Sequence, residues 1–254
     1  MNVDISKQGP VTIVTITRPR VRNAVDPATA EDLVTAFTEF DSDPDALVAV
    51  LTGQGGNFCA GADLKSLSQG NVRPVVEEGD GPMGPTRMTL GKPVIGAIEG
   101  YAVAGGLELA LWCDLRVAAS DAVLGVFCRR FGVPLVDLGT VRLPRLIGHS
   151  QAMDMILTGR AVGASEALNM GLVNRLSVPG GALEAAILLA KEIATAPQCC
   201  MRNDRLSAIE QWELSWEEAT RNEVRRGLAT ISSGETASGA TAFSRGEGRH
   251  GTRS

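Results

Sequence analysis

The segment Ile98-Glu99-Gly100-Tyr101-Ala102-Val103-Ala104-Gly105-Gly106-Leu107-Glu108-Leu109-Ala110 decides how this 254-residue chain is interpreted. Apolar residues from Pro93 to Ile98 predict a buried strand, and the glycines then lead into an apolar helix. A helix that begins at glycines presents unpaired backbone N–H groups and the positive end of its dipole, which together stabilise a negatively charged oxygen. Glu108 falls in the first turn, where an acid commonly just satisfies the dipole. Its apolar neighbours also predict burial, and a buried carboxylate has a raised pKa and can transfer protons.

A second turn of small residues, Asn57-Phe58-Cys59-Ala60-Gly61-Ala62-Asp63-Leu64-Lys65, follows a short apolar strand predicted over residues 47–51. Backbone N–H groups in such a turn have no strand partner and can point at an oxygen atom. Asp63 stands where a helix can begin, so the simpler interpretation is a tight connection in which Asp63 caps that helix. Spacing alone leaves both interpretations open.

Strands and helices alternate around these two segments through the first two thirds of the chain. Alternating residues 11–17 predict a strand, and residues 27–40 predict a helix with Asp26 as its N-cap. A further strand is predicted over residues 115–118. This alternation is typical of an α/β fold with parallel strands. Residues 70–85 carry glycine, proline and acids without periodicity and predict a mobile loop.

From about residue 150 the sequence predicts mainly helices. They are expected over residues 152–157, 165–170, 181–194, 204–212 and 216–231, with a short strand over 172–175. We therefore divide the chain into a core of residues 1–195 and a C-terminal helical region of residues 196–254. The tail beyond Ser244 is rich in glycine and arginine, and we expect it to be frayed.

Composition excludes several classes of protein. A net charge of −5 gives no general attraction to nucleic acid or to an anionic membrane. No apolar stretch approaches the roughly 20 residues that span a membrane, and the first residues do not resemble a secretory signal. Five cysteines without zinc-site spacing predict reduced thiols and a cytoplasmic protein. Only two histidines, His149 and His250, are available, so we expect no histidine-based metal site and no serine–histidine–aspartate triad.

The order of these motifs resembles that of the enoyl-CoA hydratase/isomerase (crotonase) superfamily. The matching stretches are residues 22–24, 59–65, 100–114, 132–143, 157–160 and 167–173. Together they cover nearly the whole chain in the right order. The resemblance implies a crotonase-like spiral of ββα units, with a C-terminal helical region that mediates homotrimers, often paired into hexamers.

The resemblance also implies that two backbone N–H groups hold the oxygen of an acyl thioester. By position these belong to Ala62 and Gly105. Ala104 stands where the first of three glycines is usual, and we expect this exchange to cost little because only Gly105 approaches the ligand. Coenzyme A, as part of the substrate and with no separate cofactor, is expected along Arg22, Ala24, Ala60, Asp63, Leu64 and Lys65. Arg22 and Lys65 would face its phosphates, although a lone cation is more often a solvated surface residue.

Hydratases of this superfamily use two glutamates, and the first matches Glu108. The second position falls on Cys128, which we place among the substrate-binding residues. Its neighbours Arg129 and Arg130 would favour an activated thiol. The simpler interpretation is a small buried side chain, since free cysteine usually packs as a small hydrophobe.

Asp137 is the alternative second carboxylate. It lies in Asp137-Leu138-Gly139-Thr140, which resembles the Asp-x-Gly-Thr stretch that supplies a catalytic aspartate in dienoyl-CoA isomerases of the superfamily. The competing interpretation is an N-cap for the helix that follows. Three functions stay open: a hydratase or isomerase using Glu108 with Asp137, another reaction such as thioester hydrolysis or C–C cleavage centred on Glu108, and an acyl-CoA-binding protein that catalyses little.

Overall fold

A computed structural model describes residues 2–247 of the chain. The chain divides into two compact units, Met1–Ala194 and Thr195–Ser254. Both β-sheets lie in the first unit, and the described part of the second unit contains helices without strands. The expected α/β class with parallel strands is confirmed.

The larger sheet has the strand order β1-β2-β3-β4-β6-β9. Its strands are β1 (Val3–Gln8), β2 (Val11–Ile16), β3 (Val48–Gly53), β4 (Val94–Ile98), β6 (Leu115–Ala119) and β9 (Arg175–Ser177). Only β1 is antiparallel, with Val3 opposite Ile16. The other strands pair in parallel, as where Val11 of β2 lies opposite Val48 of β3. Parallel strands bring their carboxyl ends to one edge, so the loops that follow β3 and β4 meet there.

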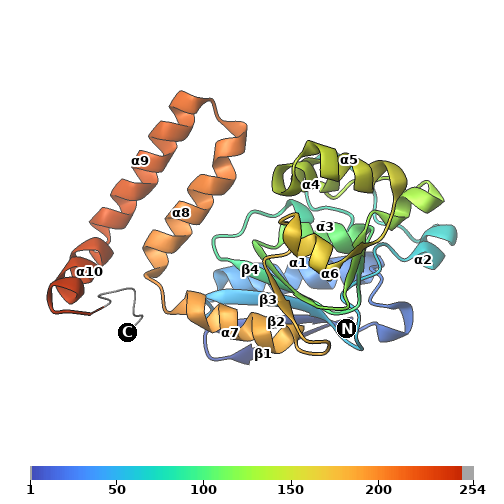
Figure 1. Ribbon diagram of the computed structural model, residues 1–254, viewed down its shortest axis with the longest axis horizontal. Helices are drawn as coiled ribbons and strands as arrows, with labels where there is room; N and C mark the ends of the chain where they lie inside the picture. The colour runs from blue at the N-terminus through green and yellow to red at the C-terminus, as the bar shows by residue number, and fades with distance from the viewer. Residues whose placement is uncertain (1, 248–254) are drawn as a thin grey trace. The chain divides into compact units, whose positions relative to one another are not determined.

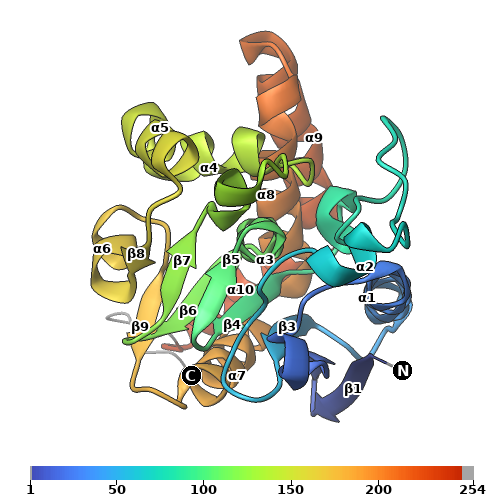
Figure 2. The same cartoon turned by 90° about the vertical axis from the view of Figure 1, so that its right-hand side faces the viewer.

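A smaller sheet of β5 (Tyr101–Val103), β7 (Val123–Gly125) and β8 (Val162–Gly163) lies next to helix α3 (Gly105–Trp112), as Figure 2 shows. β5 pairs in parallel with β7, and β7 pairs antiparallel with β8. Since β5 ends at Val103, the sheet leads the chain directly into the start of α3.

Helices cover both faces of the larger sheet (Figure 1). The helices of the first unit are α1 (Pro27–Ser42), α2 (Leu64–Ser68), α3, α4 (Gly139–Ile147), α5 (His149–Thr158), α6 (Ala164–Asn169) and α7 (Ala182–Ala194). The apolar face of α7, including Ala186 and Ala190, packs on alternate residues of β2, β3 and β4. On the opposite face the core includes Phe37 of α1 and the apolar residues of α3. The described part of the second unit contains α8 (Gln198–Glu210), α9 (Trp216–Ser232) and α10 (Glu235–Ser244).

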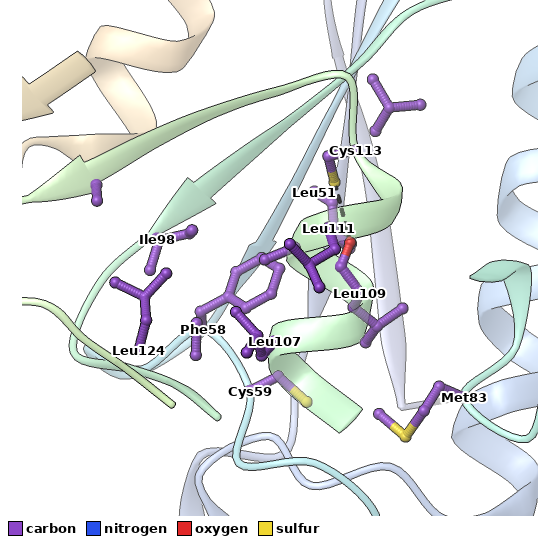
Figure 3. Packing of buried hydrophobic residues seen from close by; sticks show 14 of the residues in the cluster. Leu51, Phe58, Cys59, Met83, Ile98, Leu107, Leu109, Leu111, Cys113 and Leu124 are labelled. Carbon is purple, nitrogen blue, oxygen red and sulfur yellow. Dashed lines mark hydrogen bonds between the residues drawn. The ribbon is translucent and has the colours of Figure 1, made fainter. Parts of the chain in front are cut away.

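Helix α3 is buried on nearly every side. Gly105 to Leu111 are all buried, including the carboxylate-bearing Glu108, which is 2% exposed. Figure 3 shows Leu107, Leu109 and Leu111 packed among core side chains, with Cys59 and Met83 at the N-terminal end of the helix. A helix that is apolar all round sits in the core, so neighbouring protein groups rather than water have to satisfy the free carbonyls at its C-terminal end.

Arg116 of β6 donates hydrogen bonds to the free carbonyl oxygens at the C-terminal end of α3. Its guanidinium is fully buried and donates to the carbonyl oxygens of Ala110 (3.3 Å), Cys113 (2.7 Å) and Leu172 (2.8 Å). No carboxylate in the described chain forms an ion pair with it. The last carbonyls of a helix lack intrahelical partners, so this buried cation replaces solvent at the end of α3.

The strand predicted over residues 172–175 is wrong in position, because β9 begins only at Arg175. The N–H groups of Leu172 and Val173 both donate to the Ala167 carbonyl, and the Leu172 carbonyl accepts from Arg116, so this stretch is a buried turn. Five other elements were not expected from the sequence: β1, β5, β7, β8 and α10. Helix α8 begins at Gln198, before the predicted residue 204. The expected fraying beyond Ser244 falls mostly outside the described residues, which end at residue 247.

We expect Arg116→Met to lower the free energy of unfolding by about 3 kcal/mol, because three buried carbonyls lose their donor. Arg175→Met is the matched control, since the Arg175 side chain is 53% exposed and has one carboxylate partner at 3.6 Å. Urea denaturation of both variants measures the difference. A loss below about 1 kcal/mol for Arg116→Met would contradict this role.

Candidate active site

Ala62 presents a backbone N–H that has no acceptor in the described chain. Ala62 pairs with Val25 in an isolated parallel bridge, in which the Val25 N–H donates to the Gly61 carbonyl (2.8 Å) and the Asp63 N–H donates to the Val25 carbonyl (2.9 Å). In a parallel bridge, the N–H of the central residue points away from the partner strand. The Ala62 N–H therefore faces the opposite side, toward the cavity that Ala62 lines.

Asp63 has the capping role that the simpler interpretation gave it. Its carboxylate accepts from the N–H groups of Lys65 (3.1 Å) and Ser66 (3.2 Å) at the start of α2. It also forms an ion pair with Arg18 (3.0 Å), which contacts Asp26 as well (2.9 Å). These bonds fix the turn that carries the Ala62 N–H.

Gly105 presents the second unpaired N–H. It is the first residue of α3, and no carbonyl in residues 2–247 accepts its N–H. The turn before Ala62 comes so close that a Cβ atom on Gly61 would lie 2.9 Å from the Gly105 nitrogen. A Cβ on Gly106 would collide with the Cys59 carbonyl. The two turns therefore meet backbone to backbone, with both free N–H groups bordering one cavity.

The expectation that alanine at position 104 costs little in conformational energy is wrong. Ala104 has φ 54° and ψ −127°, a conformation that favours glycine over any residue with a Cβ. It is held there because its N–H donates to Gly125 (2.9 Å) and its carbonyl accepts from Leu107 (3.0 Å) and Glu108 (3.2 Å). Such strain costs about 1–3 kcal/mol.

Glu108 has the buried position and raised pKa expected of it. Its Oε1 accepts from the backbone N–H groups of Asp137 (2.9 Å) and Gly139 (2.8 Å), so the carboxyl orientation is fixed. Its Oε2 receives no hydrogen bond from the described protein. Burial raises the pKa from 4.5 to about 7, with the nearby Asp137 carboxylate adding to the rise and the two N–H donors opposing it.

Asp137 does not cap helix α4, so the competing interpretation is wrong. The N-cap of α4 is Leu138, without a side-chain bond. The Asp137 carboxylate instead accepts from the Met83 N–H (2.9 Å) and the Thr86 hydroxyl through Oδ1. Burial raises its pKa, against the opposing effect of these bonds.

One cavity of about 370 Å³ brings most of the expected site residues together. Its lining includes Ala60, Ala62, Asp63, Leu64, Gly105, Glu108, Cys128 and Asp137. Arg22, Ala24 and Lys65 lie outside it. Arg22 is exposed, with its guanidinium 5.1 Å from the Tyr101 ring centre, Ala24 is buried, and Lys65 is exposed. The expected coenzyme A contacts of these three residues stay a prediction.

Cys128 is a buried side chain in the cavity wall, and the activated-thiol interpretation is wrong. Burial raises the pKa of its thiol, and the neighbouring Glu108 raises it further. Arg129 donates to the Ile156 carbonyl (3.0 Å), and Arg130 donates to the Gly159 carbonyl (2.8 Å). Arg129 still lowers the pKa of the thiol, but burial and Glu108 outweigh it, so a thiolate at Cys128 is disfavoured.

Sequence reasoning missed Met83 and Thr86, which orient Asp137 and lie in and just after the segment predicted as a mobile loop. Residues 69–84 contain neither helix nor strand, as their composition indicated. The only local signal was glycine: Gly84 has φ 94°, and a Cβ there would lie 2.7 Å from the Ala30 carbonyl.

This chain is similar to known proteins in both sequence and structure. The sequence profile of the family described as enoyl-CoA hydratase/isomerase matches residues 6–248. Enoyl-CoA hydratase EchA19 of Mycobacterium tuberculosis is 35% identical over 246 residues, covering 94% of this chain and 92% of that protein. (E)-Benzylidenesuccinyl-CoA hydratase of Thauera aromatica is 37% identical, covering 82% of each. The crystal structure of enoyl-CoA hydratase EchA1 from Mycobacterium marinum matches with a TM-score of 0.91 at 37% identity, covering 96% of each chain.

Ala104→Gly tests the backbone strain. We expect it to raise the free energy of unfolding by about 1 kcal/mol, because glycine adopts the observed φ without a Cβ clash. This figure is smaller than the full strain because glycine also increases the conformational entropy of the unfolded chain. Urea denaturation checks this, with Ala182→Gly at the start of α7 as a control that should destabilise. A loss of stability in Ala104→Gly would contradict the strain.

Glu108→Gln tests the buried carboxyl through stability. A raised pKa means that the folded state holds the proton more tightly, so this stabilisation is complete below pH 4.5 and is lost as the pH rises through about 7. Glutamine keeps the acceptor oxygen and removes the charge, so we expect it to stabilise the protein by about 2 kcal/mol at pH 8 and hardly at pH 4. Urea denaturation at both pH values measures this. A variant no more stable than wild type at pH 8 would contradict the expectation.

Proposed function

This chain belongs to the enoyl-CoA hydratase/isomerase family and is an enzyme that transforms acyl-CoA thioesters, and on this premise we propose that it adds water to a 2-enoyl-CoA. The observation that carries the proposal is one cavity that holds the Glu108 carboxyl together with the unpaired N–H groups of Ala62 and Gly105. A thioester carbonyl between those N–H groups would bring the reacting carbons to the carboxyl.

The two N–H groups act as the oxyanion hole in this proposal. As the water oxygen bonds to C3, the π electrons of the double bond move toward C2 and negative charge grows on the thioester oxygen. Ala62 and Gly105 donate to that oxygen, and the dipole of α3 adds to the attraction. One such donor typically contributes about 3 kcal/mol of transition-state stabilisation.

Glu108 is the proposed proton carrier. Its carboxylate takes a proton from water while the hydroxyl oxygen bonds to C3, and the protonated carboxyl then gives a proton to C2, which completes the product and restores the carboxylate. Oε1 is fixed by two backbone donors, which leaves Oε2 for this exchange. A pKa of about 7 suits a group that must both accept and release a proton near neutral pH.

Asp137 is the proposed second carboxylate. Its Oδ1 is held by Met83 and Thr86, and its Oδ2 accepts no hydrogen bond from the described chain. Isomerisation of a 3-enoyl to a 2-enoyl thioester is a second candidate, which the thiol at Cys128 favours. That reaction needs no bound water, because a carboxylate removes a proton from C2, the dienolate forms, and the proton returns to C4.

Coenzyme A is proposed to run from the cavity past Ala24 toward Arg22 and Lys65, two exposed cations suited to its phosphates. For the assembly we propose a homotrimer, or a hexamer of two trimers, formed through the C-terminal helices α8, α9 and α10. The support is exposed apolar surface on this unit, where Trp216 is 90%, Leu228 57% and Ile231 59% exposed. A cytoplasmic location is proposed because all five cysteines are free. Residues 2–247 contain no helix that is long and apolar enough to cross a membrane.

Crotonyl-CoA hydration, followed at the enoyl absorbance, tests the carboxylate roles. We expect Glu108→Gln to lower kcat by about a thousandfold, because proton transfer by a positioned group is lost. Asp137→Asn should lower kcat by about tenfold or more. Unchanged rates in both variants would remove the proposal, and a panel of saturated, 3-enoyl and dienoyl thioesters separates hydrolysis and isomerisation from hydration.

The pH dependence of kcat/KM is a further test. Because Glu108 accepts a proton as carboxylate, kcat/KM should rise with pH and level off above about 7. The measurement is the initial hydration rate at low crotonyl-CoA between pH 5 and pH 9. A midpoint near the ordinary carboxyl value of 4.5 would show that Glu108 is not the titrating base.

A further inference from the structure

Arg73 is the only cation among the described residues that line the cavity. The lining also contains four carboxylates, of Asp26, Asp63, Glu108 and Asp137. Asp26 and Asp63 are already paired with Arg18. Among the described lining residues, Arg73 is therefore the cation that a bound anion could contact directly.

The guanidinium of Arg73 is incompletely satisfied. Its Nη2 lies 3.4 Å from Asp80 Oδ2, longer than the usual 2.7–2.9 Å of a charge-assisted hydrogen bond. Its Nη1 is buried and has no acceptor in the described structure. A buried donor without a partner is costly, and a ligand oxygen would remove that cost.

Arg73 lies on a loop whose later residues reach Asp137. Its partner Asp80 directly precedes Gly81, where an added Cβ would collide with Asp137 Oδ1. Arg87 fastens the same loop by donating to the carbonyls of Val76 (2.6 Å) and Val136 (3.1 Å). An acyl group that extends away from the oxyanion N–H groups and past Asp137 would reach this loop.

Several of the residues that line the cavity with Arg73 are apolar. Val72, Pro74, Val75, Phe131 and Val136 line the same cavity, and they offer no side-chain acceptor. A hydrocarbon chain would leave Nη1 unpaired, whereas a carboxylate would give this nitrogen a charged acceptor.

From this arrangement we infer that the enzyme prefers acyl thioesters whose acyl group carries a carboxylate at its far end, and that Arg73 binds this carboxylate. The inference rests on the proposed function, since the thioester must lie at Ala62 and Gly105 for the far end to reach Arg73. The same guanidinium chemistry would also suit a phosphate of coenzyme A, so the experiment separates the two sources.

Binding calorimetry of two saturated thioesters tests the inference without turnover. Hexanoyl-CoA and hexanedioyl-CoA (a monothioester) have the same chain length, and only the latter ends in a carboxylate. We expect the wild-type enzyme to bind hexanedioyl-CoA more tightly, and Arg73→Met to reduce this preference by about 10- to 100-fold. Arg73→Lys should keep part of it. Arg175→Met, which removes an exposed arginine with a similarly distant carboxylate partner, should leave both affinities unchanged.

Asp80→Asn provides a second, opposite test. Removing the competing carboxylate frees Arg73. The preference for hexanedioyl-CoA over hexanoyl-CoA should therefore be a few-fold larger in this variant than in wild type. An equal loss for both thioesters in Arg73→Met would assign Arg73 to a coenzyme A phosphate. No preference in wild type, or an equal effect of every variant on both ligands, would leave Arg73 with the structural role of tethering the loop. Each result overturns the inference.

A failure of the proposed function can be distinguished from a failure of the inference about Arg73. If wild type and Glu108→Gln both fail to turn over hex-2-enoyl-CoA and the monothioester of hex-2-enedioic acid, the proposed hydration is wrong, whereas the calorimetric preference still decides the role of Arg73. If hex-2-enoyl-CoA is hydrated well and Arg73→Met changes the two substrates alike, the inference fails and the proposed function stands.

Discussion

Two backbone turns meet at the start of α3 with no room for a side chain between them, and the site depends on this contact. Gly61 approaches the nitrogen of Gly105, and Gly106 lies against the carbonyl of Cys59. A side chain at Gly61 or Gly106 would push the turns apart and separate the N–H groups of Ala62 and Gly105. The contact is possible because parallel strands β3 and β4 deliver both turns to the same edge of the sheet.

The helix that carries Glu108 is held at both ends by groups outside it. At its C-terminal end the guanidinium of Arg116 takes up the free carbonyls, and at its N-terminal end Ala104 adopts a strained backbone conformation. Strain and an acid of raised pKa in one short helix are both destabilising features. Strain of this kind persists only where surrounding structure over-determines it, and it clusters at functional sites.

Much of the fold and part of the site could be predicted from the sequence. The 27–40 helix with its Asp26 cap is confirmed by the bond from the Thr29 N–H (2.9 Å), because capping is local chemistry. The burial of Glu108 could also be predicted from the sequence, since its neighbours are apolar. The hydrogen-bond partners of Asp137 could not be predicted, because Met83 and Thr86 are more than 50 residues away in sequence and lie in or next to an aperiodic loop. Ala104 was misjudged because its φ depends on bonds to Gly125 and to the helix, which no sequence pattern reveals.

We propose that the N–H groups of Ala62 and Gly105 together polarise a thioester carbonyl. Infrared difference spectroscopy of bound butyryl-CoA, labelled with ¹³C at the carbonyl, measures this directly, because hydrogen bonding to the oxygen weakens the C=O bond. If both N–H groups donate to the oxygen, the carbonyl stretch of the bound thioester lies at a lower frequency than in water. A frequency equal to or above that in water would show that the oxygen lies outside the two N–H groups, and would contradict the claim.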